Sequence, residues 1–404
     1  YNVACGTALA ATTTGGQNVA VGFAALGSNT TASGNTAVGD YALNANTTGA
    51  RNVAVGKNAL DANTTDTDNT AVGYDALTAA AGAYYSVGVG TYAGAATTTG
   101  VSNTFVGYSA GKLNTTGAEN TVVGSLAFDA NTTGNNNVAI GRQALTANTT
   151  ADDNVAVGDN AMNVSSTGEA NTALGTRTLL AATTANYNTA VGKDAGMGIT
   201  TGGYSTIVGV SAGVTISTGT ALTAVGYGAA NATTANDITA VGYRAAVSHT
   251  SGTNLTAFGT EALEANTTAN NNTAVGFRAG EDNTTGTENT YFGAYAGTNL
   301  TTADYGTFVG SQAGSNSTLT GNANTLLGRA AGHYCSSGAE NTFVGMNAGL
   351  NLSTGSNNTG VGTSALGNLT SGSTNAVLGH GAGTTGNPGG NVTTHSNHLI
   401  VGND

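Results

Sequence analysis

Tryptophan is absent from this chain of 404 residues, proline occurs once, cysteine occurs twice, and only 7% of the residues are charged. No stretch approaches 18 consecutive apolar residues, so we expect no transmembrane helix and no membrane insertion. The 9 Lys and Arg residues are outnumbered by 21 Asp and Glu residues. Because nucleic acids and anionic lipids are bound by clustered basic residues, this balance disfavours both as partners.

Two motifs of common catalytic and cofactor sites are also missing. The sequence has no HExxH and no Walker loop, and its five histidines are scattered. His395 and His398 lie close enough to Asp404 to be weighed as ligands of a divalent ion, although a solvated end loop explains them better. We therefore expect no catalytic residue, no cofactor, no metal and no enzymatic activity.

Pairs of neighbouring acidic residues keep one enzymatic alternative open. They are Asp66 with Asp68, Asp152 with Asp153, and Glu281 with Asp282. Glycosidases need two carboxyl groups about 5 to 9 Å apart across a substrate groove. None of the pairs is accompanied by the Trp or Tyr platform typical of sugar-cutting sites, so we interpret them as solvated corners. A polysaccharide depolymerase remains the alternative.

What the chain does contain is one short phrase, an apolar residue followed by glycine, repeated from Gly6 to Gly402. Of the 23 intervals between these glycines, 19 are 17 residues long. A fixed period of this length is the signature of a solenoid. We call these residues anchor glycines and number each repeat from them, so that position −1 precedes the anchor and position +3 follows it by three.

The composition of the repeat decides between helix and strand. The unit from Asn35 to Arg51 reads NTAVGDYALNANTTGAR. With 63 glycines and many Thr and Asn residues, a helical repeat would lose about 0.5–1 kcal/mol at each of many positions. Thr, Val, Gly and Asn favour short strands joined by tight corners. The sequence therefore predicts an all-β fold, a parallel β-solenoid or β-roll of about 24 coils, one per repeat.

The columns of the repeat predict which side chains face the interior. Position −1 is apolar at every anchor, and Thr or Val dominates position −3, so we expect these two columns to face the interior. Ala at position +3, as at Ala42 and Ala59, suits a narrow interior. Cys5 belongs to the −1 column and is interpreted as a small buried hydrophobe. Cys335 lies about 19 coils further on, too far for an intrachain disulfide; pairing with another chain is a minor alternative for it.

Position −2 should then point outward, yet it is apolar. An outward apolar row would form an exposed patch of the kind that soluble monomers rarely keep, so we predict a lateral partner, most simply the same chain. We expect a homotrimer, with a dimer as the alternative, and a second possibility is that this column is the other half of a flattened core. The predicted interface consists of Ala37, Ala54, Ala71, Phe105, Ile207, Tyr291, Phe308, Leu326 and Phe343.

The repeats NVAVG, NTAVG and NVAIG resemble those in the heads of trimeric autotransporter adhesins, which form trimeric parallel β-rolls. The longer phrases NTAVGYDAL and NNNTAVGFRAG, with their NTTG corners, are even more similar to repeats in bacteriophage tail-fibre proteins. In those proteins the repeats commonly precede a self-cleaving chaperone domain, and SNHLIVGND at residues 396–404 is similar to the final rung before it. We accordingly expect a continuous solenoid over residues 1–379, and an irregular terminal rung over residues 380–404 that precedes a missing C-terminal region.

The resemblance implies a structural and adhesive role. The expected function is the shaft of a trimeric phage tail fibre that attaches to a glycan or protein of the host cell surface, located on the virion. A bacterial surface adhesin, located on the cell surface, is the alternative. Rows of corner threonines such as Thr30, Thr47 and Thr64 make an ice-binding solenoid a further alternative, although these rows are interrupted at several coils. Corner Asn-x-Thr triplets, as at Asn46, are interpreted as turns and not as glycosylation sites.

Overall fold

The computed structural model describes residues 1–315, 318–384 and 393–402. These residues contain 24 β-strands and no helix, so none of them forms a helix that could cross a membrane. The chain divides into two compact units, Tyr1–Tyr204 and Ser205–Asp404, each with twelve strands. The predicted all-β parallel solenoid is confirmed.

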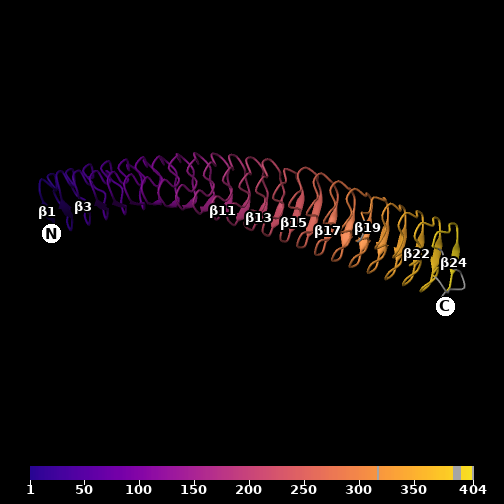
Figure 1. Cartoon of the computed structure of the whole chain (residues 1–404). Helices are drawn as coiled ribbons and strands as arrows, with labels where there is room; N and C mark the ends of the chain where they lie inside the picture. The colour runs from indigo at the N-terminus through magenta and orange to yellow at the C-terminus, as the bar shows by residue number, and fades with distance from the viewer. Residues whose placement is uncertain (316–317, 385–392, 403–404) are drawn as a thin grey trace. The chain divides into compact units, whose positions relative to one another are not determined.

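In the first unit the strands follow one another in chain order, and each pairs in parallel with the next (Figure 1). Each strand residue pairs with the residue at the same position of the next repeat: Val19 pairs with Thr36, and Val21 pairs with Val38. The strands are β1 Val3–Cys5, β2 Val19–Val21, β3 Thr36–Val38, β4 Val53–Val55, β5 Thr70–Val72, β6 Val87–Val89, β7 Thr104–Val106, β8 Thr121–Val123, β9 Val138–Ile140, β10 Val155–Val157, β11 Thr172–Leu174 and β12 Thr189–Val191.

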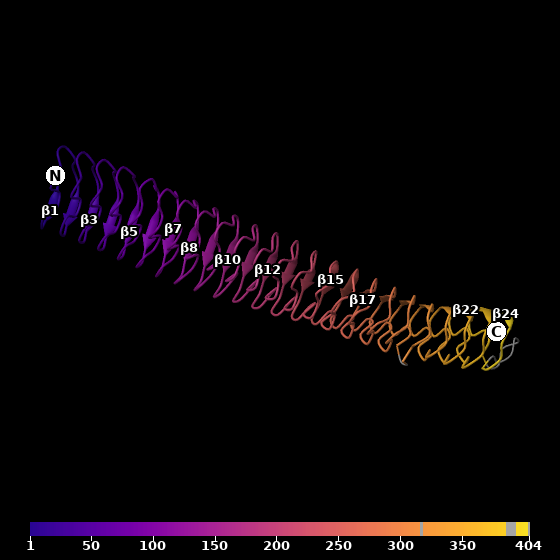
Figure 2. The same ribbon diagram turned by 90° about the horizontal axis from the view of Figure 1, so that it is seen from above.

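The second unit repeats this arrangement (Figure 2). Two of its strands are one residue longer, because apolar residues Ile238 and Leu255 replace the usual Asn at position −4. The strands are β13 Thr206–Val208, β14 Thr223–Val225, β15 Ile238–Val241, β16 Leu255–Phe258, β17 Thr273–Val275, β18 Thr290–Phe292, β19 Thr307–Val309, β20 Thr325–Leu327, β21 Thr342–Val344, β22 Thr359–Val361, β23 Ala376–Leu378 and β24 Leu399–Val401.

The anchor glycine ends each strand in a conformation that requires glycine. Gly56 has φ +137°, and a Cβ built on it would lie 2.3 Å from the carbonyl oxygen of Gly73, the next anchor. No side chain fits so close to the backbone of the next coil. The non-glycine residues Asn58 and Leu60, at positions +2 and +4, also have positive φ values of 57° and 52°. The corner after the strand is therefore a series of left-handed turns that begins at the anchor.

The predicted direction of the strand columns is wrong. Side chains at position −2 point into the coil, and those at −3 and −1 point outward, as the alternating burial of β3 and β4 shows. All nine residues assigned to the interface are inside and have 0% exposure in the single chain: Ala37, Ala54, Ala71, Phe105, Ile207, Tyr291, Phe308, Leu326 and Phe343. They are core residues, as the flattened-core alternative required, and they offer no surface to a second chain. Cys5 at position −1 is correspondingly exposed.

The interior explains why position −2 is so often Ala. It faces Ala at position +3 and Leu at +4, as with Ala37, Ala42 and Leu43, all of which have 0% exposure. Inward packing of the +3 alanines was predicted and is confirmed. Where position −2 is large, position +4 of the same coil is Gly, which makes room for the side chain. These pairs are Phe105 with Gly111, Ile207 with Gly213, Tyr291 with Gly297, Phe308 with Gly314, Leu326 with Gly332, and Phe343 with Gly349.

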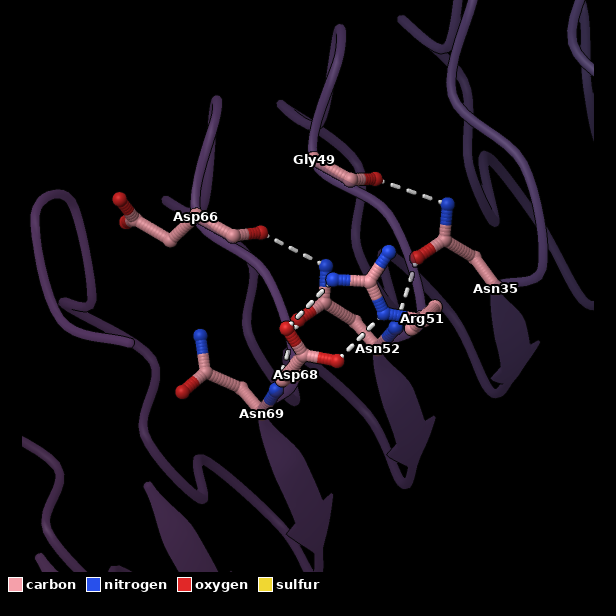
Figure 3. Close-up of polar contacts among 7 residues, drawn as sticks. All are labelled: Asn35, Gly49, Arg51, Asn52, Asp66, Asp68 and Asn69. Atoms are coloured by element: carbon pink, nitrogen blue, oxygen red, sulfur yellow. Dashed lines mark hydrogen bonds and ion pairs between the residues drawn. The ribbon is translucent and has the colours of Figure 1, made fainter. Parts of the chain in front are cut away.

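A file of buried asparagines at position −4 joins successive coils (Figure 3). The backbone N–H of Asn52 donates to Oδ1 of Asn35 at 2.8 Å, and the N–H of Asn69 donates in turn to Oδ1 of Asn52 at 2.9 Å. The side-chain amide of Asn52 donates to the carbonyl of Asp66 at 2.8 Å. The Asn52 side chain therefore satisfies two backbone groups of the next coil that are buried away from water.

Candidate functional site

The outward residues at positions −3 and −1 form a surface that we call the strand face. Every residue in the 24 strands is uncharged, so no Lys, Arg, Asp or Glu side chain lies on this face within the strands of either unit. Exposed strands of soluble proteins are usually protected by charges. A row of β-branched and apolar residues without charge is the composition expected of the core of an interface.

In the second unit the strand face is most regular. Position −3 is Thr in ten successive strands, from β13 to β22, and each Thr pairs with the next, as Thr273 does with Thr290. Position −1 carries larger residues than in the first unit. Phe258 and Phe292 are 54% and 56% exposed. These two rings add exposed apolar area to the strand face of the second unit.

In the first unit the strand face mixes Val and Thr at position −3 and is mostly Val at position −1. Val21, Val72 and Val123 are 36–38% exposed. The apolar surface predicted from the sequence therefore exists, but on the column next to the anchor and not on the column at position −2.

The corner threonines tie the coils together. Thr30 Oγ1 donates to the carbonyl of Thr47 at 3.1 Å, and Thr47 Oγ1 donates to the carbonyl of Thr64 at 3.1 Å. The same bond recurs from Thr115 to Thr132 at 2.8 Å. These hydroxyl protons are used within the chain, so these corner files are not an array of donors presented to water.

The corner asparagines of the Asn-x-Thr triplets face inward. They have 0% exposure and are Asn29, Asn46, Asn63, Asn131 and Asn266. Asn46 Nδ2 donates to the carbonyl of Gly49 in its own corner at 3.0 Å, as the turn interpretation predicts. The left-handed backbone that we associated with these residues occurs elsewhere in the coil, at the +2 and +4 positions. Glycan attachment would require each of these amides to leave a buried hydrogen-bonded file.

Members of the three acidic pairs make contacts between coils. Asp68 and Arg51 form a bidentate ion pair, with Nε–Oδ1 and Nη2–Oδ2 distances of 2.6 and 2.7 Å (Figure 3). The hydrogen bonds from Arg51 lower the pKa of Asp68. Asp66 accepts the N–H of Gly82 at 2.6 Å, and burial raises its pKa. Asp152 accepts the N–H of Asn135 at 2.6 Å. Each of these three carboxylates therefore takes part in holding neighbouring coils together.

The structure brings together a group of charges that sequence reasoning missed. Carboxylate oxygens of Glu261, Glu264 and Glu281 all lie within 4.8 Å of one another. Two arginines neutralise most of this charge: Arg244 Nη2 lies 2.6 Å from Glu264 Oε1, and Arg278 pairs with Glu281 and Glu261. Burial raises the pKa of Glu264 in spite of Arg244. Three carboxylates are the ligand type for a hard cation, but here the arginines already occupy them.

The repeat itself contains the signal for this cluster. Arg244, Glu261 and Arg278 share position +2 in successive coils, and Glu264 and Glu281 share position +5. Aligning the sequence at its anchors places the two columns side by side. Sequence reasoning considered only acidic residues close in the chain and missed partners such as Glu261 and Arg278, which are 17 residues apart.

The remaining candidates fall in different places. Cys335 is buried, which raises the pKa of its thiol to about 12, and its Sγ donates to the carbonyl of Gly338 at 3.6 Å. A disulfide from Cys335 to another chain is therefore ruled out in this fold.

The rings of His395 and His398 contact edge to face with centroids 5.7 Å apart. Asp404, weighed with them as a metal ligand, lies outside the described residues, as does much of the predicted irregular rung.

Exposed aromatic pairs were also missed by the sequence analysis. Tyr74 and Tyr92 meet edge to face with ring centroids 5.5 Å apart, and Tyr227 and Tyr243 stack at 5.6 Å. Tyr74 and Tyr92 occupy positions +1 and +2 of neighbouring coils, whereas Tyr227 and Tyr243 both occupy position +1. The sequence analysis considered Tyr platforms only beside the acidic pairs and not on the surface beside the anchors.

Comparison of the sequence with described protein families and with curated proteins finds no match. The function must accordingly be argued from the surfaces of the chain itself.

Proposed function

We propose that this chain is the shaft of a self-associating fibre, most simply a homotrimeric tail fibre of a bacteriophage used in host-cell attachment. The observation that carries the proposal is the uncharged strand face. Each unit presents twelve strands whose outward side chains are Val, Thr, Leu, Ile, Ala, Phe or Cys. Apolar residues in such a row are stabilised when a second surface removes them from water, by about 25 cal/mol per Å².

A second copy of the same chain is the partner that best suits this face. The strand face is repetitive, so its complement must repeat with the same period, and an identical chain has that property. The resemblance of the repeats to adhesin heads and tail fibres favours three copies. We place the assembly on the virion, with the surface of a bacterial cell as the alternative location.

The proposed mechanism is mechanical and multivalent. Repeated coils joined by asparagine and threonine files hold recognition elements away from the particle. Three copies of such an element raise its effective concentration at the host surface without any new contact. The partner at the cell surface is a glycan or a protein, and neither an enzymatic step nor nucleic-acid binding is part of the proposal.

One observation favours a second candidate, an ice-binding surface. The ten-strand Thr file of the second unit is regular and lies within the strands, unlike the corner files considered from the sequence. Phe258 and Phe292 protrude from the same face, which argues against a flat contact with ice. Inhibition of ice recrystallisation at micromolar protein would support this candidate; its absence would remove it.

The test of the fibre proposal is a pair of substitutions on the strand face. Phe258→Ser with Phe292→Ser should lower the oligomeric mass measured by sedimentation equilibrium, because both rings are exposed in the single chain. The matched control is Tyr227→Ser with Tyr243→Ser, which removes a stacked exposed aromatic pair beside the anchors of the same unit. An unchanged mass in the phenylalanine variant would overturn the assignment of the strand face as the interface.

A further inference from the structure

A strip of polar side chains runs across successive coils of the second unit, away from the strand face. It consists of the residues at positions +2 and +5 between Arg244 and His333, and we call it the polar strip. The Glu and Arg cluster occupies its first part. The coils that follow carry Tyr295 with Thr298, Gln312 with Ser315, and finally His333.

The second part of the polar strip is hollowed. A pocket of about 270 Å³ lies there, and its lining residues are Tyr295, Thr298, Asn299, Gln312, Ser315 and His333. This volume is near the lower end of the range for small-molecule sites, which begins at roughly 300 Å³. The pocket therefore accommodates a single small ring and not an extended chain.

The pocket lies beside an irregularity of the repeat. The interval between Gly310 and Gly328 is 18 residues, the only interval of that length in the chain, and Gln312 and Ser315 belong to this longer coil. The pocket therefore coincides with a departure from the 17-residue period.

The aromatic wall of the pocket is held in place. The ring of Phe277 contacts Tyr295 edge to face with centroids 5.1 Å apart, and the guanidinium carbon of Arg278 lies 6.0 Å from the Tyr295 ring centroid. Tyr295 is half-buried. An aromatic ring fixed in this way offers a rigid surface at little cost in side-chain entropy.

The rest of the lining is neutral and hydrogen-bonding. Ser315 Oγ lies 3.0 Å from His333 Nδ1, and Asn299 Nδ2 donates to the Ser315 carbonyl, so three of these groups brace one another. The side-chain amide of Gln312 makes no hydrogen bond to another residue in the described part of the chain. It therefore has a donor and an acceptor to offer to a ligand.

The charge beside the pocket selects against anions. The adjoining part of the polar strip contains three carboxylates and two guanidinium groups, and Glu281 is 92% buried in this network. No lining residue of the pocket is an Arg or Lys. A negatively charged ligand would meet repulsion from these carboxylates, and the pocket lining offers it no Arg or Lys.

We propose that this pocket binds one neutral sugar ring, whose apolar face packs on Tyr295 and whose hydroxyl groups bond Gln312, Asn299 and Thr298. This inference rests on the proposed adhesive function and names the ligand class for it. The pocket is a receptor site along the shaft, so recognition does not depend only on an element at the end of the fibre. Repetition of a weak site in each chain of an oligomer then provides avidity.

The experiment is saturation-transfer NMR of the full chain with glucose, galactose, mannose and N-acetylglucosamine, and with glucuronic and galacturonic acids as anionic counterparts. At least one neutral sugar should bind with a Kd of about 1–10 mM, the range for so small a ligand, and both uronic acids should bind at least tenfold more weakly. Tyr295→Ala and, separately, Gln312→Ala should each weaken binding at least tenfold. Ala330 occupies the same position +2 with φ 54°, so the coil accepts Ala there.

Tyr41→Ala is the matched control. Tyr41 has φ 59° against 60° for Tyr295, and it meets Phe23 edge to face at 5.3 Å, yet it lies in the other unit and away from the pocket. Its removal should leave sugar binding unchanged. Absence of saturation transfer for all four neutral sugars, or equal binding by wild type and Tyr295→Ala, would overturn the proposal. Sedimentation measures the oligomeric mass of the unaltered chain independently of sugar binding. A chain that binds the sugar but sediments as a monomer would contradict the fibre proposal and not the sugar site.

Discussion

The ring of Phe105 fills the space that a side chain on Gly111 would need. A Cβ built on Gly111 would lie 2.2 Å from Cδ1 and from Cε1 of that ring. Six of the twelve coils of the first unit have the reverse arrangement, with a small residue at position −2 and Leu at position +4, as in Ala54 and Leu60. A large side chain at one of these two positions requires a small one at the other, because the narrow interior is close-packed and leaves little free space.

This exchange predicts a strong coupling between two substitutions. Phe105→Ala should lower the free energy of unfolding by about 3–5 kcal/mol through the cavity that it leaves, and Gly111→Leu should be destabilising because the leucine meets the ring. The double variant recreates the common coil, whose Leu60 has φ 52° against 57° for Gly111, and should recover much of the loss. A urea-unfolding double-mutant cycle measures the coupling. Simple additivity of the two losses would contradict the account.

The asparagine file predicts a cost for removing a single amide. In Asn52→Ala the buried N–H of Asn69 loses its acceptor, and the carbonyl of Asp66 loses one donor. A buried polar group left unsatisfied costs about 1–3 kcal/mol, so the urea midpoint should fall clearly. Thr48→Ala, at an exposed corner position with no side-chain hydrogen bond to the described residues, is the control and should leave the midpoint nearly unchanged. Equal effects in the two variants would argue against the file as a stabilising element.

Tyr291 predicts a stabilising substitution. Its side chain is fully buried at position −2, its ring stacks on Phe308 with centroids 5.5 Å apart, and its hydroxyl has no hydrogen-bond partner among the described residues. Burial raises the pKa of this phenol. Tyr291→Phe keeps the stacking and removes the unpaired hydroxyl, so the free energy of unfolding should rise by about 1 kcal/mol. Thermal unfolding gives the answer, and a lower melting temperature for Tyr291→Phe would show that the hydroxyl is satisfied in solution.

The buried carboxyl of Asp66 predicts how stability depends on pH. Its pKa is raised above the unfolded value mainly by burial, so its contribution is largest below the unfolded pKa and is lost as pH rises through the folded pKa. Stability should therefore increase as pH falls from 7 towards 4, and Asp66→Asn should reduce that increase. Asp68 has the opposite sign: Arg51 lowers its pKa, so its contribution is lost only as pH falls through that depressed pKa. Urea unfolding at pH 7, 5 and 4 compares the variants, and an unchanged pH dependence in Asp66→Asn would contradict the assignment.

Much of the fold was predictable because the period is so regular. The spacing of the anchors, the abundance of Gly, Thr and Asn, and the alanines at position +3 led to parallel coils in register. The direction of the strand was not predictable by the same reasoning. In a two-sided strand of three residues, Val and Thr at positions −3 and −1 look like the core, whereas the interior is so narrow that it takes Ala at position −2 and leaves the larger residues outside.

The candidate surfaces illustrate the same limit. An exposed apolar row was expected and exists, but Phe258 and Phe292 carry it and Phe308 and Phe343 do not. The sequence shows that Phe308 at position −2 is accompanied by Gly314 at position +4, where many other coils have Ala and Leu. This exchange of large and small residues indicates that the Phe308 ring lies inside the coil. The pocket beside Tyr295 is lined by residues of three coils at different positions of the repeat, and no single column of the repeat describes it.

The central claim, that the strand face joins copies of this chain into a fibre, is tested most directly by the mass of the unaltered protein in solution. Light scattering on the purified chain should give about three times the chain mass of 39.1 kDa, and intact-mass spectrometry of the same sample establishes the mass of one chain. A value of one chain across micromolar concentrations would contradict the account, because the uncharged strand face would then be stable in water without a partner.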